Sequence, residues 1–343
     1  MTNSEKPRLV IYGVGQFGKH VVRFAVQKGW PIVAAVNRAG DKVGKDVGEL
    51  AGIEALGVLV QDCDSVDYAS LDADIGVVTT TNLLDVNHQA HTRLLSAGLN
   101  VVCHGTESYY PKANNPELAV KLDALAKERG VTFTGSGIWD MSRIWSGMLV
   151  AGPTVELTSL FHSSRTDIVP QCESKEQTYP FGNTLTVEEF HARGLSKNPI
   201  AKSYKSIPEH VLAGLGYTIK NTKSYVEPAV FDEDYESEFM ECVIPAGNCV
   251  GIRIIAEIET EEGVTAKSEI EVRHFRDDDV EHMFWEVNGN PKARMRVERE
   301  DSSYMSAACL FNRIPDVIAA PPGIQPVSKL GPLKSTALIN TRS

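Results

Sequence analysis

The sequence lacks the features that mark membrane proteins, disulfide-rich proteins and nucleic-acid-binding proteins. It has no uninterrupted apolar run of the ~20 residues that are needed to cross a bilayer. Its six cysteines include no Cys-x-x-Cys pair, which argues against a zinc knuckle or a disulfide scaffold and favours free thiols. Lys and Arg (34) are fewer than Asp and Glu (45), and the net charge of -11 opposes binding to nucleic acid or anionic lipid.

A secretory signal is also missing from the start of the chain. The segment from Met1 to Arg8 has no apolar core or cleavage site, and it leads directly into an apolar strand pattern. We therefore expect a cytoplasmic protein. No spacing of His, Cys, Asp or Glu indicates a metal site. These absences together favour a small-molecule ligand, with no nucleic-acid or membrane partner.

The length of 343 residues suggests two domains, because globular domains average about 150 residues. In the first half, short β-branched runs alternate with helical patterns, which is typical of a parallel α/β sheet. We expect strands at 8–12, 31–36, 75–79, 100–103 and 131–133, and helices at 18–28, 84–97 and 115–129.

The pattern changes after about Gly152, where longer segments alternate apolar and polar residues. This alternation predicts an antiparallel sheet in a second domain, with Glu262-Gly263 in the turn of a hairpin. The expected strands are 155–162, 217–226, 249–259 and 265–275, followed by a last helix at 303–312. We expect the polar segment 171–183 to form a loop.

A glycine motif follows the first expected strand and opens the first expected helix. Its residues are Gly13-Val14-Gly15-Gln16-Phe17-Gly18, which match the pattern Gly-x-Gly-x-x-Gly of dinucleotide-binding domains. In that role Gly13 permits the tight turn, Gly15 lets the backbone approach pyrophosphate, and Gly18 permits close packing of helix and strand. The alternative is an ordinary glycine turn, but the strand and helix on either side favour dinucleotide binding.

The end of the second strand bears on the choice between NAD and NADP. NAD-specific sites place Asp or Glu there to bind the ribose hydroxyls, whereas this chain has Asn37 and Arg38. Asn37 can bond a ribose oxygen without repelling a 2'-phosphate, and Arg38 can pair with that phosphate. We therefore expect NADP, with NAD also accepted. If Arg38 is only a solvated surface charge, the chain would use either cofactor.

Polar residues follow two further strands, at the carboxyl edge where such sheets bind ligands. Thr79, Thr80 and Thr81 are candidates for cofactor contacts, although Thr81 or Asn82 could instead cap the next helix. After the following strand, Glu107 could hold ammonia or an amine, remove its proton and stabilise an iminium cation. His104 is a competing candidate for this role and a candidate cofactor contact, and either residue could instead lie in a surface loop.

Several segments of the chain resemble the family of 2,4-diaminopentanoate dehydrogenases and related native amine dehydrogenases. The similar segments are 13–18, 106–111, 115–119, 122–132 and 135–138, and more distantly 186–190, 226–228 and 321–323. The resemblance implies a fold like that of dihydrodipicolinate reductase and a homodimer. It also implies reversible reductive amination of an aldehyde or ketone with ammonia, with Glu107 as the catalytic glutamate and Gly137 at the cofactor.

The resemblance and the strand pattern together give an expected domain plan. Residues 1–150 would form a Rossmann domain, and 151–300 an α+β domain for substrate binding and dimerisation. Residues 301–343 would form a C-terminal segment that packs back on the Rossmann domain. The fold class is α/β, with a mainly antiparallel sheet in the second domain.

The chain departs from the family pattern after Gly137. Relatives commonly have Gly-Thr-Gly-Ile-Asn-Pro-Gly-Phe where this chain has Gly135-Ser136-Gly137-Ile138-Trp139-Asp140-Met141-Ser142. Ile138, Trp139 and Trp145 would form a compact pocket for small apolar carbonyl compounds, unless the tryptophans belong to the core. Arg165 could bind a substrate carboxylate or form a surface ion pair.

Two other functions remain open from the sequence alone. One is an enzyme of the same fold that reduces a carbonyl or an imine without ammonia. The other is a sensor that binds the dinucleotide without turnover.

Overall fold

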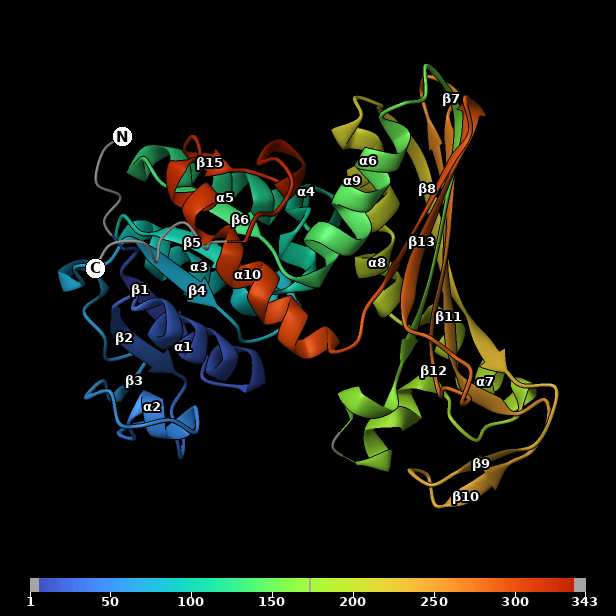
Figure 1. Cartoon of the computed structure of the whole chain (residues 1–343), viewed down its shortest axis with the longest axis horizontal. Helices are drawn as coiled ribbons and strands as arrows, with labels where there is room; N and C mark the ends of the chain where they lie inside the picture. The colour runs from blue at the N-terminus through green and yellow to red at the C-terminus, as the bar shows by residue number, and fades with distance from the viewer. Residues whose placement is uncertain (1–5, 173, 336–343) are drawn as a thin grey trace. The chain divides into compact units, whose positions relative to one another are not determined.

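The computed structural model describes residues 6–172 and 174–335, which form two compact units (Figure 1). Unit 1 comprises Met1–Met141 and Asp301–Ser343, and unit 2 comprises Ser142–Glu300. The expected boundary at residue 150 therefore moves to residue 141. The reason is that α6 (Ser146–Ala151) packs against strands of unit 2, where Gly147 lies against the ring of Trp285.

Unit 1 is built on a seven-stranded sheet in which the described pairings are parallel. The strand order is β15-β6-β5-β4-β1-β2-β3. Their bounds are β1 Leu9–Tyr12, β2 Ile32–Asn37, β3 Val60–Asp62, β4 Ile75–Val78, β5 Asn100–Cys103, β6 Thr132–Gly135 and β15 Gly323–Ile324. This confirms the expected α/β class, because the order reverses on either side of β1 as in a doubly wound sheet.

Helices cover both faces of this sheet (Figure 1). They are α1 Gln16–Lys28, α2 Val47–Leu50, α3 Leu84–Ser96, α4 Pro111–Asn114, α5 Pro116–Arg129 and α10 Ser302–Ala319. Leu9 and Ile11 pack towards α1 and α10, whereas Val10 and Tyr12 pack into the core on the α3 and α5 side. Burial on both faces explains why the strands are continuous apolar runs in the sequence.

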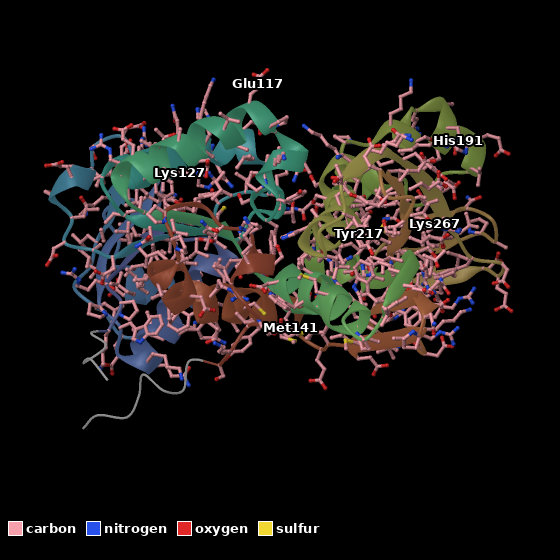
Figure 2. The ribbon with its side chains drawn as sticks, turned by 90° about the horizontal axis from the view of Figure 1, so that it is seen from above. Glu117, Lys127, Met141, His191, Tyr217 and Lys267 are labelled. Atoms are coloured by element: carbon pink, nitrogen blue, oxygen red, sulfur yellow. The ribbon has the colours of Figure 1, made fainter. Side chains whose placement is uncertain are left out.

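Helix α5 shows how the outer surface is made. Leu122 and Ala126 are buried, while Glu117 and Lys127 are exposed (Figure 2). The side chain of Asn115 caps the helix by accepting from the backbone N–H of Leu118, and Gly130 ends it in the left-handed conformation. Asn, Pro and Gly therefore occupy the two ends of this helix, at positions where helices commonly have them.

The C-terminal part of the chain completes unit 1. Helix α10 continues past the expected end at residue 312 to Ala319, although it contains Pro315. Its buried side chains Leu310, Ile314 and Val317 keep the helical spacing across the proline, and this packing outweighs the lost hydrogen bond. Strand β15 then pairs with β6, so the expected last strand at 131–133 is not the edge of the sheet.

Unit 2 contains a six-stranded sheet with the order β14-β13-β7-β12-β11-β8. The bounds are β7 Glu156–Asp167, β8 Ile219–Val230, β11 Cys249–Thr260, β12 Thr265–Arg273, β13 His282–Asn290 and β14 Ala293–Glu298. The β11–β12 hairpin is antiparallel as expected, and among the described pairings only β7 with β12 is parallel. The sheet is therefore mainly antiparallel, which agrees with the sequence.

Other elements of unit 2 were not expected. They are the β13–β14 hairpin, the small hairpin of β9 Tyr235–Ser237 and β10 Cys242–Ile244, and the helices α7 Val187–Ala192, α8 Ile200–Tyr204 and α9 Ser206–Gly214. Part of the expected loop forms 3-10 turns at Val169–Gln171 and Lys175–Phe181. Within the described ranges, no helix has both the length and the apolar character of a membrane span.

Candidate functional site

The glycine motif forms the turn between β1 and α1, and its geometry requires glycine at two positions. Gly13 has φ of +101°, and an added Cβ would lie 2.8 Å from Cγ2 of Thr80. An added Cβ at Gly18 would lie 2.1 Å from the carbonyl oxygen of Gly13. Helix and strand are therefore packed too closely for any side chain at Gly18.

Gly15 differs from Gly13 and Gly18 because a side chain added at this position would point into open space. A Cβ added there would meet no described atom within 4 Å. Among the described residues, no side chain caps the start of α1, and its first turn carries no acidic residue. The first turn of α1 therefore has no side-chain cap and open space at Gly15, and pyrophosphate binding there stays a prediction.

The other residues of the motif have different surroundings. Val14 is buried and Gln16 is exposed at the first position of α1. Phe17 is half-buried, with its ring centroid 4.5 Å from that of His104. Burial lowers the pKa of His104 to about 4, so this ring is neutral near pH 7. His104 therefore contacts the glycine motif as a neutral aromatic ring rather than as a cation.

The end of β2 holds the glycine motif through side-chain contacts. Oδ1 of Asn37 lies 3.4 Å from the backbone nitrogen of Val14, and the amide of Asn37 donates to the carbonyl of Arg38. Arg38 itself is exposed. Lys42, which the sequence analysis did not identify, donates to the carbonyl oxygen of Val14 at 2.9 Å. A second positive charge therefore lies beside the motif.

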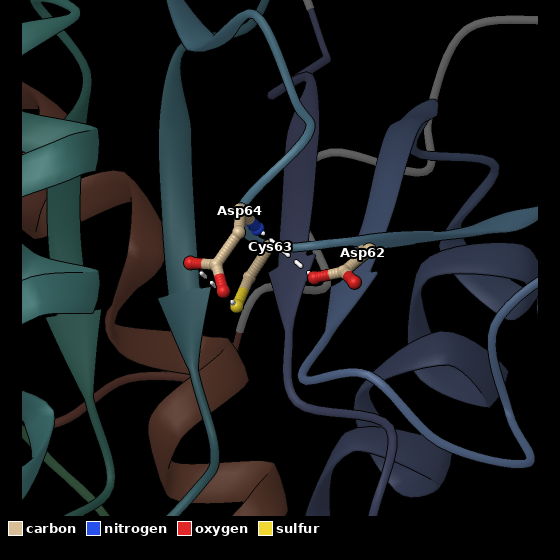
Figure 3. Close-up of side chains that lie close together, drawn as sticks. All are labelled: Asp62, Cys63 and Asp64. Carbon is tan, nitrogen blue, oxygen red and sulfur yellow. Dashed lines mark hydrogen bonds between the residues drawn. The ribbon is translucent and has the colours of Figure 1, made fainter.

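Strand β3 ends next to Asn37 in a small acidic turn (Figure 3). Asp62 is the register partner of Asn37, and it accepts from the backbone N–H of Asp64 at 3.0 Å. Asp64 accepts a long bond of 3.8 Å from the thiol of Cys63 and pairs with Arg93. These bonds account for the turn, so we assign no metal to the group formed by Asp62, Cys63 and Asp64.

The three threonines after β4 bind neighbouring protein groups through their hydroxyls. Thr79 is buried and donates to the carbonyl oxygen of Gly13 at 2.6 Å, which fastens β4 to the glycine motif. Thr80 donates to Asn87. Thr81 accepts from the backbone N–H of Leu83 at 3.0 Å. These hydroxyls thus hold the sheet edge in place, and their contact with a cofactor stays a prediction.

Glu107, the candidate catalytic residue, lies in the loop that follows β5. It lies in a 3-10 turn, Thr106–Ser108, and is 7% exposed. Its Oε2 accepts from the backbone N–H of Leu84 at 2.9 Å, at the first position of α3. The residue preceding this helix, Leu83, supplies no side-chain cap. Glu107 therefore caps the N-terminus of α3 from a distant loop.

Two asparagines hold the segments that follow β4 and β5 at this edge of the sheet. Asn87 is buried on α3, and its amide donates to the carbonyl of Thr81 at 2.7 Å. Asn114 is also buried, and its amide donates to the carbonyl of Glu107 at 3.3 Å. Neither residue was identified from the sequence. The sequence signal that could have identified them is an asparagine within a helical segment, a residue type that is normally unfavourable there.

The segment after β6 returns to the same edge of the sheet. Gly137 has φ of +154°, and an added Cβ would lie 2.5 Å from the hydroxyl of Tyr109. The backbone N–H of Ile138 donates to Oγ of Ser306 at 3.3 Å. Trp139 is 5% exposed, with its ring 5.5 Å from that of Tyr109. Trp139 therefore packs beside the loop of Glu107.

A buried ion pair holds this segment against α10. Asp140 accepts two bonds from the guanidinium of Arg313, at 2.7 and 2.8 Å, and a third from the hydroxyl of Ser136 at 2.8 Å. Both charged side chains are fully buried. Trp145, in contrast, ends a π-helical turn, Asp140–Trp145, and belongs to unit 2. The unit 1 residues around Glu107 therefore form the candidate site without Trp145.

Arg165 does not present a free charge to a substrate. On β7 it pairs with Glu271 at 2.9 Å and with Asp279 at 2.7 Å. Of the two roles considered from the sequence, the structure supports the ion pair.

The chain is similar to known reductases and dehydrogenases. A protein-family model described as dihydrodipicolinate reductase, N-terminus, matches residues 7–109. The 2,4-diaminopentanoate dehydrogenase of Acetoanaerobium sticklandii is 26% identical over 341 residues, which cover 93% of this chain and 92% of the relative. This chain is a homologue of 2,4-diaminopentanoate dehydrogenase. The resemblance inferred from its motifs is thus confirmed.

Two further comparisons agree with this assignment. The amine dehydrogenase of Mycobacterium smegmatis is 28% identical and has a TM-score of 0.81, with 97% of this chain and 98% of that chain covered. The 4-hydroxy-tetrahydrodipicolinate reductase of Anaeromyxobacter dehalogenans is 27% identical over 197 residues, which cover 56% of this chain and 67% of the relative. The similarity to the amine dehydrogenase spans both units, so it includes the second sheet as well as the dinucleotide-binding domain.

Proposed function

We propose that this protein is an NAD(P)-dependent amine dehydrogenase that catalyses reversible reductive amination of small aldehydes or ketones with ammonia. One observation carries the proposal. The carboxylate of Glu107 is buried at the N-terminus of α3, on the sheet edge that also holds the glycine motif. The homology to a diaminopentanoate dehydrogenase and the similarity to an amine dehydrogenase support an oxidoreductase that acts on a carbon–nitrogen bond.

Glu107 has a role on each side of the proposed reaction. When ammonia adds to a carbonyl and water leaves, one proton taken up from solvent makes the product an iminium cation. A nearby carboxylate accepts the proton that the nitrogen loses when ammonia attacks, returns it to the departing hydroxyl as water forms, and then stabilises the cation. A nicotinamide bound at the glycine motif would supply the hydride. In the reverse direction, the same carboxylate takes a proton from the substrate ammonium and leaves the neutral amine that hydride loss requires.

The residues around the glycine motif would select the cofactor. Gly15 and the first turn of α1 would hold the pyrophosphate. Arg38 and Lys42 would attract a 2'-phosphate, which favours NADP. Asp62, in register with Asn37, provides a carboxylate at the end of the neighbouring strand, and we therefore expect NAD to be accepted as well.

The substrate and the assembly follow from the sequence and the homology. Ile138 and Trp139 are apolar and lie next to the Glu107 loop, and we expect small apolar carbonyl compounds as substrates. The contact of Trp145 with substrate stays a prediction. We also expect a homodimer, which light scattering after gel filtration would test. A cytoplasmic location stays a prediction.

The first experiment is consumption of NADPH and NADH with a panel of small aldehydes and ketones, with and without ammonium at alkaline pH. Cofactor oxidation that requires ammonium would support the proposal. Oxidation without ammonium would indicate a carbonyl or imine reductase. Tight cofactor binding with no turnover across the panel would indicate a sensor.

A further inference from the structure

Unit 2 has a pocket of its own at one end of its sheet. Its volume is about 480 Å³. Its lining comes from β7, β9 and the segments that follow β9 and β12, and it includes Asp167, Tyr235, Glu238, Phe239, His274 and Phe275. All of them lie within Ser142–Glu300, so the pocket does not depend on the glycine motif or on Glu107.

The parallel pairing of β7 and β12 explains how this pocket forms. Asp167 is the register partner of Arg273 at the ends of these two strands. Because parallel strands end at the same edge, the next residue of β12, His274, emerges beside Asp167. The hydroxyl of Tyr235 donates to the carbonyl of Phe275 at 3.0 Å, which fixes the β9 side of the pocket.

The charged groups that line the pocket are acidic. Asp167 is half-buried, and one oxygen accepts from the backbone N–H of Val169 at 3.1 Å. Burial raises the pKa of Asp167, and the nearby acid Glu281 raises it further. Glu238 is an exposed carboxylate at the same pocket, and no described Lys or Arg lines it. Arg273 does not line the pocket, but its guanidinium lies 5.9 Å from the centroid of the Phe275 ring, and it pairs with Asp279 at 2.8 Å.

His274 provides the second, independent feature. Its side chain contributes to the pocket and is fully buried, at 0% exposure. Neither ring nitrogen has a hydrogen-bond partner among the described residues. Burial lowers the pKa of His274 to about 4, so near pH 7 the neutral ring has one nitrogen that can accept a hydrogen bond. A buried polar group without a partner is costly, and a bound donor would remove that cost.

We propose that this pocket binds the ammonium group of a primary alkylamine. An ammonium has three N–H donors, and the pocket offers acceptors in Asp167, Glu238 and the unprotonated nitrogen of His274. Aromatic rings attract a cation and also pack against an alkyl chain, and both Phe239 and Phe275 line this pocket. This site is distinct in its residues from the proposed amination site, and it does not rest on that proposal.

The test is calorimetric titration of the full-length protein, without nicotinamide cofactor, with butylammonium chloride and with butan-1-ol at constant ionic strength. The alcohol has the same chain but no charge. We expect butylammonium to bind and the alcohol to bind at least about tenfold more weakly, because charged hydrogen bonds are lost. Asp167→Asn should weaken butylammonium binding by about tenfold or more.

Two further variants make the result specific. Glu238→Gln changes an exposed residue, so it should fold normally and still weaken binding. Glu233→Gln is the matched control and should bind butylammonium as the wild type does, since Glu233 is an exposed acid of unit 2 that does not line the pocket. The proposal is overturned by absence of butylammonium binding, by equal binding of the alcohol, by wild-type affinity in both pocket variants, or by an equal loss of affinity in Glu233→Gln.

Discussion

The substitution Glu107→Gln separates the structural and chemical roles of this residue. Glutamine keeps a side-chain oxygen that can accept from the N–H of Leu84, so the hydrogen bond at the start of α3 survives. The lost stabilisation is the interaction of a negative charge with the helix N-terminus, typically about 0.3–1 kcal/mol and up to ~2 kcal/mol when partly buried. Removing a buried charge also removes a desolvation penalty, which offsets part of this loss.

The expected effect on turnover is larger than the effect on folding. A general acid–base group contributes about 10²- to 10⁴-fold to a rate, which corresponds to about 3–5 kcal/mol of barrier. We therefore expect Glu107→Gln to lose ammonia-dependent turnover by at least about a hundredfold, while the free energy of unfolding changes by about 1 kcal/mol or less. Cofactor affinity should stay unchanged, because Glu107 is not part of the glycine motif.

Three measurements on the same preparation decide this prediction. They are steady-state rates with saturating ammonium, NADPH affinity by fluorescence, and urea denaturation. Turnover within about threefold of wild type would remove Glu107 from the chemistry. Equal losses in turnover and in folding stability would show that the residue acts only as a helix cap. Asn114→Ala is a useful comparison, since it removes a support of the loop without changing the carboxylate.

Three other substitutions test the remaining parts of unit 1. Gly15→Ala should leave the melting temperature nearly unchanged, because an added Cβ meets no described atom within 4 Å and φ is -92°. It should weaken NADPH binding by about tenfold or more, because the methyl group would block the pyrophosphate. Retained NADPH affinity would contradict pyrophosphate binding at Gly15. Lys42→Ala should raise Kd for NADPH by about tenfold and leave that for NADH nearly unchanged in paired titrations, and an equal loss for both would refute a 2'-phosphate contact. Arg313→Met should lower the free energy of unfolding by about 3–5 kcal/mol in urea denaturation, because the carboxylate of Asp140 stays buried without its cation, and a change below about 1 kcal/mol would show that the pair is not needed for folding.

The sequence alone determined much of unit 1. Apolar runs of β-branched residues predict buried strands, and the glycine motif between the first strand and helix predicts a dinucleotide-binding turn. These features are local, since each depends on residues close together in the chain. The same holds for the β11–β12 hairpin in unit 2, which follows from alternation on either side of Glu262-Gly263.

Several elements of unit 2 were not predicted, because their sequence patterns are short or interrupted. Strand β13 alternates buried and less buried residues, but Phe284 and Gly289 interrupt its apolar–polar pattern, and β14 has only 6 residues. Helices α7 and α8 are only 6 and 5 residues long, too short for a helical period to repeat clearly. The boundary between the units lies after Met141, whereas residue 150 was expected, because α6 packs on strands of unit 2. No local sequence pattern indicates this packing.

Only the tertiary structure decided which side chains meet at the candidate site. Residue type and position predicted that Glu107 lies at the sheet edge, but not that it accepts from Leu84 across 23 positions of the chain. The contact of Thr79 with Gly13 spans 66 positions, and that of Asp140 with Arg313 spans 173. Such pairs depend on how separate elements pack, whereas strands and turns depend on neighbouring residues, and this difference sets what the sequence could determine by itself.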